Sequence, residues 1–177
     1  THFPEVNLRF YVKYRHQQGW KRGVVFISEI VPKPMIAWVA NTLYKERYSA
    51  VSMKHQPELK NDQWLVQYQW KYEGQWFQIQ VEADNKPQAM RPESEEAFIF
   101  EHYWGYSRVK ESVTNEYQVL HPSWQVYPVT NYTVNCDFGL QYGSVFAGLN
   151  NASPASVFLA GGSAISVAGK RTITGSW

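Results

Sequence analysis

Two side chains in one short stretch, Glu29 and Lys33, have types and positions that suit chemistry. They follow an apolar run, Val24–Ile27, and precede an amphipathic segment. Four apolar residues in succession indicate a strand that is buried on both faces. A carboxyl group and an amine at the end of such a strand can line a pocket and have perturbed pKa values. Both are therefore candidate catalytic residues.

The two candidates have different alternatives. A reactive Lys33 needs burial, whereas a lysine between two prolines in a first helical turn is usually solvated, and we favour the solvated interpretation. Alternation places Glu29 with Val25 and Ile27, facing an apolar layer, so its carboxyl group should be at least half buried and hydrogen-bonded. It is either a site residue or half of a structural ion pair, for example with Arg9.

A second set of polar side chains alternates along the segment that opens the chain, EVNLRFYVKY. On the inner wall of a barrel, one face of this strand would bind an anionic or hydroxylated ligand, with an arginine holding a carboxylate. On an outer face the same residues would be solvated. The candidate ligand-binding residues here are Glu5, Asn7, Arg9 and Tyr11.

Two aromatic corners, HYWGY and HPSW, supply the remaining candidates. Packing around a corner glycine or proline explains them better than ligand binding does. The five histidines have no metal-ligand spacing, and no nucleophile elbow, phosphate loop or dinucleotide fingerprint is present. We therefore expect no metal and no cofactor. The candidate ligand-binding residues are His102, Tyr103, His121 and Trp124.

The elements that must position these residues are mostly strands. An apolar stripe of Ile36, Val39, Ala40 and Leu43 predicts a helix over 32–46 that faces a sheet. Matched alternation around Glu73-Gly74 predicts a hairpin. We expect a mainly β (α+β) fold, with a curved antiparallel sheet or partial barrel and two helices packed on it. Other expected elements are a helix at 94–103, a helical or loop segment at 142–149, and strands at 6–14, 23–29, 48–53, 106–110, 116–121, 125–136 and 164–167.

Composition narrows the function classes. The 177 residues suit a single domain, and a composition of 44% hydrophobic and 18% charged residues argues against disorder. A net charge of +2 with scattered basic residues argues against nucleic acid as a partner. The single cysteine, Cys136, excludes an internal disulfide. No apolar run is long enough to cross a membrane, so we expect a cytoplasmic protein with no membrane partner.

Several segments carry a resemblance to a known family. FPEVNLRFYV, GVVFISEIVPKPMIAWVANTLYKERY, SEEAFIFEHYWGY and EYQVLHPSW resemble, in this order, the YqjF-like family of uncharacterised bacterial proteins (domain of unknown function 2071). The similarity runs from about Phe3 to Val167. The family is related to the acetoacetate decarboxylase-like superfamily, which implies a sheet closed around a ligand cavity. It also implies strands upstream of residue 3, so we expect 1–177 to lack N-terminal strands, leaving an open edge that would recruit a second copy.

The resemblance also implies a reaction. The decarboxylases form a Schiff base on a lysine, in a motif with Arg-Glu followed by Pro-Lys-Lys. Here Ser28-Glu29 and Pro32-Lys33-Pro34 match it without the arginine and without the second lysine, whose charge lowers the pKa of the reactive amine. Three functions stay open. The protein binds a small organic ligand, neutral or anionic, in a barrel cavity, or it is a lyase-like Schiff-base enzyme acting on a keto acid, or it is a protein-interaction module with an aromatic surface. An enclosed position of the aromatic residues favours the first, and an exposed patch favours the last.

Overall fold

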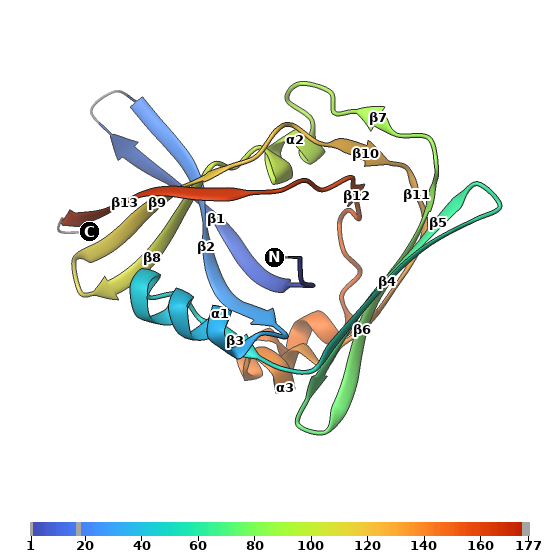
Figure 1. The fold of residues 1–177 in the computed structure, drawn as a ribbon, viewed down its shortest axis with the longest axis horizontal. Coiled ribbons are helices and arrows are strands. Elements are labelled where there is room, and N and C mark those ends of the chain that lie inside the picture. Colours follow the sequence, from blue (N-terminus) through green and yellow to red (C-terminus); the bar gives the residue numbers. More distant parts are fainter. Residues whose placement is uncertain (1, 17–18, 175–177) are drawn as a thin grey trace. The chain divides into compact units, whose positions relative to one another are not determined.

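Strands make up most of the residues that the computed structural model describes, which are 2–16 and 19–174. The expected α+β class with curved sheets is confirmed (Figure 1). The chain forms two compact units. Unit 1 contains residues 2–4, 51–90 and 124–161, and unit 2 contains residues 5–50, 91–123 and 162–174.

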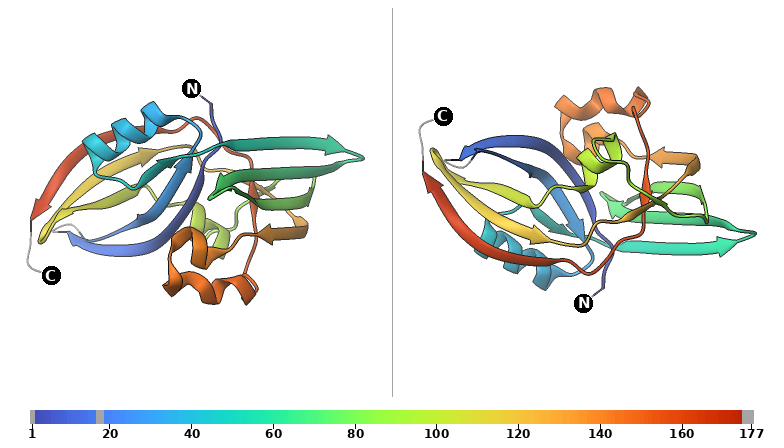
Figure 2. Two further views of the ribbon diagram at one scale, coloured as in Figure 1. Left: turned by 90° about the horizontal axis from the view of Figure 1, so that it is seen from below. Right: turned by 90° about the horizontal axis from the view of Figure 1, so that it is seen from above.

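Unit 2 is built on one sheet with the strand order β1-β2-β8-β9-β13, and β3 pairs with β2 in parallel. Its strands bend along their length (Figure 2). Among the described residues β1 pairs only with β2 and β13 only with β9, so this sheet has two open edges and does not close into the expected barrel. The strands are β1 (Val6–His16), β2 (Gly19–Val31), β3 (Tyr48–Ala50), β8 (Trp104–Lys110), β9 (Val113–Leu120) and β13 (Ser166–Thr174).

A bulge in β2 decides which way Glu29 faces. Leu8 pairs with Ser28 but Arg9 pairs with Phe26, so β2 has one extra residue, Ile27. An extra residue reverses the alternation beyond it. Glu29 therefore shares a face with Val24, and the prediction that it lies with Val25 and Ile27 is wrong.

Two glycines allow aromatic rings to lie directly on the two faces of this sheet. A Cβ atom at Gly105 would lie 2.2 Å from the ring of Tyr117, its cross-strand neighbour. A Cβ atom at Gly23 would lie 2.5 Å from the ring of Tyr106. Adjacent strand residues point to opposite faces, so Tyr117 and Glu29 lie on one face and Tyr106 and Glu116 on the other. We call these the carboxyl face and the Glu116 face.

The helix predicted at 32–46 is present but differs in detail. It consists of α1 (Pro34–Val39) and the π-helical turn η1 (Ala40–Tyr44), and it ends at Lys45 in a left-handed conformation. Its buried residue is Ala37, whereas Leu43 of the predicted inward stripe is exposed. A π-turn has more residues per turn than an α-helix, so a 3.6-residue period does not continue through it.

The second predicted helix is confirmed as α2 (Glu95–Phe100), which ends earlier than expected. Ser94 caps it, because its side chain accepts a hydrogen bond from the main-chain N–H of Ala97 at 3.2 Å. Glu95 and Glu96 lie in its first turn, where carboxylates are favourable.

Unit 1 contains the predicted hairpin, which is confirmed. Trp64 pairs with Ala83 and Tyr72 with Gln75, and both turn residues, Glu73 and Gly74, have positive φ angles, as a type I′ turn requires. Its main sheet has the order β11-β6-β5-β4, and a smaller sheet has the order β12-β10-β7. The elements are β4 (Met53–Lys60), β5 (Gln63–Tyr72), β6 (Gln75–Asp84), β7 (Gln88–Ala89), β10 (Gln125–Tyr127), β11 (Val129–Asn135), α3 (Phe138–Tyr142), the 3-10 helix η2 (Ser144–Asn151) and β12 (Leu159–Ala160).

Candidate functional site

Three carboxyl groups and two tyrosines converge on the carboxyl face of unit 2. The parallel pairing of β2 with β3 makes Tyr48 the neighbour of Glu29, and the Tyr48 hydroxyl donates a hydrogen bond to Glu5 Oε1 at 3.2 Å. The Glu29 side chain is only 2% exposed, and its Oε2 atom is buried without a hydrogen-bond partner among the described residues. We call the set of Glu5, Glu29, Glu46, Tyr48 and Tyr117 the carboxyl cluster.

The segment from Asn41 to Tyr48 brings two members of the cluster onto the sheet. The Asn41 amide makes two hydrogen bonds with the main chain of Tyr48, at 2.8 and 2.9 Å. The Tyr44 carbonyl accepts hydrogen bonds from the side chains of Ser107 and Asn115. The segment is thus attached to β8 and β9, which fixes the positions of Glu46 and Tyr48.

Glu46 completes the cluster through Tyr117. The Tyr117 hydroxyl donates a hydrogen bond to Glu46 Oε1 at 2.6 Å, and its ring is buried. The ring of Tyr44 lies edge-on to that of Tyr117, with 5.5 Å between centroids. Together with Gly105, these contacts hold the phenol in a single orientation.

The electrostatics of the cluster favour neutral carboxyl groups. Burial, followed by the nearby Glu46 charge, raises the pKa of Glu29 to about 9. Burial also raises the pKa of Glu46 to about 7, although the hydrogen bond from Tyr117 opposes it. At neutral pH, Glu29 is therefore protonated while Glu46 is close to its titration midpoint. Such a pair can donate and accept hydrogen bonds, and it can exchange protons with a bound molecule.

The structure brings some of the residues predicted from the sequence together in two places. Glu5 and Glu29 lie in the carboxyl cluster. Arg9 and Tyr11 lie close to His102, whose ring centroid is 4.6 Å from that of Tyr11. The remaining predicted residues lie elsewhere: Asn7 pairs with Glu29 but is exposed, the ring of Tyr103 lies 4.9 Å from that of His121, and Trp124 belongs to unit 1.

The ion pair between Glu29 and Arg9, one of the two alternatives for Glu29, is not formed. Ion pairs are instead formed by Glu116, which bonds to Lys21 at 3.0 Å and to Arg171 at 2.6 Å. Arg9 instead donates a hydrogen bond to the main-chain carbonyl of Ile99. The bulge at Ile27 shifts the register at this point, so Arg9 faces Phe26 across the strand pair.

Lys33 lies at the N-terminal cap of α1. Its carbonyl accepts hydrogen bonds from the main-chain N–H groups of Ile36 and Ala37, and its side chain is partly exposed. A Schiff-base lysine works best in an apolar pocket. The position of Lys33 gives such chemistry no direct support.

The Glu116 face has a structural network. Glu116 is fully buried, and besides its two ion pairs it accepts a hydrogen bond from the Tyr106 hydroxyl at 3.0 Å. Burial raises its pKa, but the hydrogen bonds from Arg171, Lys21 and Tyr106 outweigh this and lower it overall. The Glu116 carboxylate is neutralised by two cations, and its oxygens already accept hydrogen bonds from neighbouring side chains. Glu116 therefore stabilises the fold and is not available to a ligand.

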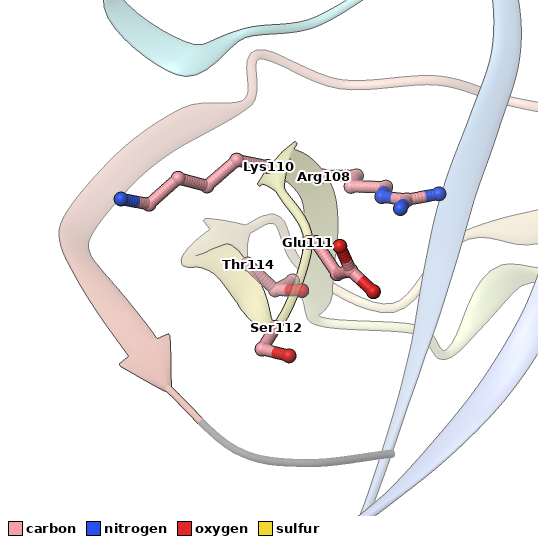
Figure 3. A pocket seen from close by; sticks show the side chains of 5 residues that line it. All are labelled: Arg108, Lys110, Glu111, Ser112 and Thr114. Carbon is pink, nitrogen blue, oxygen red and sulfur yellow. The ribbon is translucent and has the colours of Figure 1, made fainter.

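A hollow at the tip of the β8–β9 hairpin is also a poor candidate (Figure 3). Arg108 and Lys110 extend from it in opposite directions. The lining residues Arg108, Lys110, Glu111 and Ser112 are exposed. Its polar groups therefore do not converge on one point.

Sequence reasoning missed three members of the cluster: Glu46, Tyr48 and Tyr117. Glu46 was assigned to the end of a helix, and Tyr48 and Tyr117 to strands. One signal was available for Tyr48, since a short strand directly after a helix often returns to the preceding strand. Nothing in the local sequence indicates that Tyr117 approaches Glu46.

Among the described residues, His, Cys, Asp and Glu side chains form no group of three or more that is suited to a metal ion. Over the same residues, no helix combines the length and apolar character needed to cross a bilayer.

The fold and the site thus define a mostly β, α+β protein with a buried carboxyl cluster in one of its units. A comparison with protein families matched residues 1–164 to DUF2071, described as an uncharacterised conserved protein, and the chain belongs to this family. The resemblance seen in the sequence segments is thereby confirmed. A search of curated proteins found no match.

Proposed function

We propose that this protein binds a small organic molecule at the carboxyl cluster of unit 2. One observation carries the proposal: the Glu29 Oε2 atom is buried and has no hydrogen-bond partner among the described residues. An unpaired buried polar group costs about 1–3 kcal/mol. A ligand that bonds to this oxygen would remove that cost.

The chemistry of the cluster favours one class of ligand. Glu46, which is partly ionised at neutral pH, would repel a carboxylate, whereas a primary amine or a hydroxyl group can donate hydrogen bonds to the carboxyl oxygens of the cluster. Glu5, Glu46 and Tyr48 are partly exposed, so the cluster extends from the buried Glu29 to the surface. We therefore propose an amine or an alcohol here, in place of the anionic ligand and barrel cavity expected from the sequence.

Fragment binding tests this proposal. Benzylamine, benzyl alcohol and benzoate would be titrated at pH 7 by ligand-observed NMR against the wild type, Glu29→Gln, and Glu111→Gln as an exposed control in the same unit. We expect benzylamine to bind best and Glu29→Gln to weaken it about tenfold, the equivalent of 1.4 kcal/mol. Equal binding to the wild type and Glu29→Gln would refute the proposal.

A second candidate function, interaction with a second copy of this chain, has its own supporting observations. Among the described residues β1 is paired along one edge only, and unpaired strand edges recruit other strands. In the same unit, the exposed residues of α1 include Met35 and Trp38, which are 77% and 67% exposed. Sedimentation equilibrium tests this: we would expect a dimer that Phe10→Lys on the β1 edge dissociates. A monomer across the accessible concentrations would exclude it.

A further inference from the structure

We propose that Arg9, Arg22 and His102 form a binding site for an organic carboxylate with a planar apolar body. We call these residues, with Tyr11 and Phe98, the arginine–histidine site. The proposal goes beyond the carboxyl cluster and does not depend on it. Along β1, the pair Asn7–Glu29 and the pair Tyr11–Val24 are four residues apart, which is about 13 Å.

His102 is the buried member of this site. Its side chain is only 7% exposed, and neither ring nitrogen has a hydrogen-bond partner among the described residues. Its ring packs against Tyr11 at 4.6 Å and against Phe98 at 5.0 Å. A buried imidazole can donate one hydrogen bond and accept another. The main chain of Phe98 and Ile99 lies near enough to raise the pKa of the ring, but neither residue makes a hydrogen bond of acceptable geometry with its nitrogens.

Two guanidinium groups flank the same rings. The Cζ atom of Arg9 lies 5.7 Å from the ring centroid of Tyr11, and that of Arg22 lies 5.5 Å from the ring centroid of Phe98. Neither arginine forms an ion pair with a described residue, in contrast to Lys21 and Arg171, which both pair with Glu116. Two positive charges beside one aromatic cluster therefore have no bound counter-charge.

The strand register explains this convergence. Tyr11 pairs with Val24 and Lys13 pairs with Arg22, so Arg9, Tyr11 and Arg22 share the carboxyl face. α2 supplies Phe98, and the chain beyond it supplies His102. Four separate positions in the sequence thus bring charge and aromatic surface to one place.

The chemistry of these groups selects the ligand. Guanidinium groups match the geometry of a carboxylate and bind it through paired hydrogen bonds. The rings of Tyr11 and Phe98 would pack against a planar apolar body. Arg22 and Phe98 are exposed, so a ligand can reach the site from solvent.

A change in the pKa of His102 would report ligand binding directly. Burial, followed by the charges of Arg22 and Arg9, lowers the pKa of His102. The charged or titratable groups that face it are Arg9 and Tyr11 from β1 and Arg22 from β2, whereas its neighbours on α2 are Phe98 and Ile99. A carboxylate between the arginines would offset their charge and raise the pKa of His102.

The experiment uses the full chain with benzoate as the probe, and NMR of the His102 ring as the measurement. We expect millimolar binding of benzoate, with an increase of about one unit in the pKa of His102. The neutral analogue benzamide should not bind, and sulfate should bind at least tenfold more weakly than benzoate. Arg22→Gln should weaken benzoate binding about tenfold, and Arg108→Gln is the matched control at an exposed position.

Each result either supports the site or refutes it. No change in the His102 ring at 50 mM benzoate, or equal binding by Arg22→Gln, would overturn the proposal. Sulfate binding as tightly as benzoate would overturn the carboxylate assignment. Glu29→Gln should leave benzoate binding unchanged, which separates this proposal from that for the carboxyl cluster.

Discussion

The Tyr117 hydroxyl and the Glu46 carboxyl group are joined by a hydrogen bond of 2.6 Å, although the two residues are 71 positions apart. The bond connects the middle of a buried strand to a segment that follows a helix. It is the contact through which β9 holds Glu46 beside Glu29. The protonation of the carboxyl cluster therefore depends on the hydroxyl group of Tyr117, whose ring packs directly on Gly105.

Replacement of Tyr117 by phenylalanine should raise the pKa of Glu46 above 7. The hydrogen bond from Tyr117 is the main influence that opposes burial at Glu46, so its removal favours the protonated carboxyl group. We expect a loss of about 1–2 kcal/mol in the free energy of unfolding. Carbon-detected NMR titration of the glutamate carboxyls measures the shift, with Tyr72→Phe in unit 1 as the control. An unchanged Glu46 pKa would contradict the assigned bond.

Stability should decrease as pH rises from 7 to 8.5. Glu29 has a folded pKa of about 9, above its usual 4.5, so its contribution is complete below pH 4.5 and is lost as pH rises toward 9. Over 1.5 pH units the loss is about 2 kcal/mol. Urea denaturation at several pH values measures it. Glu29→Gln cannot ionise and should show a flatter profile, and an identical slope in both proteins would argue against a protonated Glu29.

Glu116→Gln should destabilise the fold more than a substitution of either cationic partner. The variant leaves Lys21 and Arg171 without their common counter-charge, at a cost of about 3 kcal/mol, reduced by the partial exposure of both cations. Lys21→Gln retains the Arg171 pair and should cost about 1 kcal/mol. Urea denaturation at pH 7 provides the comparison. Equal losses for the two variants would show that Glu116 is not the centre of the network.

Gly105→Ala should disturb the carboxyl cluster without changing any polar group. The added Cβ would lie 2.2 Å from the Tyr117 ring, so the ring must move away from Glu46. We expect a loss of about 1–3 kcal/mol together with a higher pKa of Glu46. Gly162→Ala, where no atom lies within 4 Å of the added methyl group, is the control. A stable variant with an unchanged Glu46 pKa would show that the ring tolerates displacement.

Borohydride treatment with a panel of keto acids should leave Lys33 unlabelled. Its side chain is partly exposed at the start of α1, whereas a Schiff-base amine needs an environment that favours its neutral form. Peptide mass spectrometry would locate any adduct, and Lys33→Arg is the control for specificity. A covalent label at Lys33 in the wild type alone would revive the decarboxylase-like function.

The elements that were predicted correctly are those whose signals are local. The β5–β6 hairpin follows from alternation around Glu73-Gly74, where both turn residues have positive φ angles. Helix α2 was also predicted, with its end placed at residue 103 instead of Phe100. The burial of Glu29 follows from its position at the end of an apolar strand, although its partners do not.

The features that were missed depend on distant parts of the chain. The bulge at Ile27 exists only as a mismatch between β1 and β2, so alternation within one strand assigned Glu29 to the wrong face. The carboxyl cluster combines Glu5, which directly precedes β1, with residues from β2, β9 and the segment after η1. Its geometry depends on β3, which has only three residues and a weak sequence signal.

The attachment of the Tyr44 carbonyl to Ser107 and Asn115 has a consequence for how the chain folds. These partners are 63 and 71 residues away, whereas Asn41 and Tyr48 are only seven apart. Closing a long loop costs more chain entropy, so contacts of short separation form more readily. Glu29 and Tyr48 can thus meet while Glu46 is still hydrated and has the acidity of an ordinary carboxyl group. We expect refolding near pH 7 to take up protons as β8 and β9 dock against this segment, so its last stage should slow as the medium becomes more alkaline.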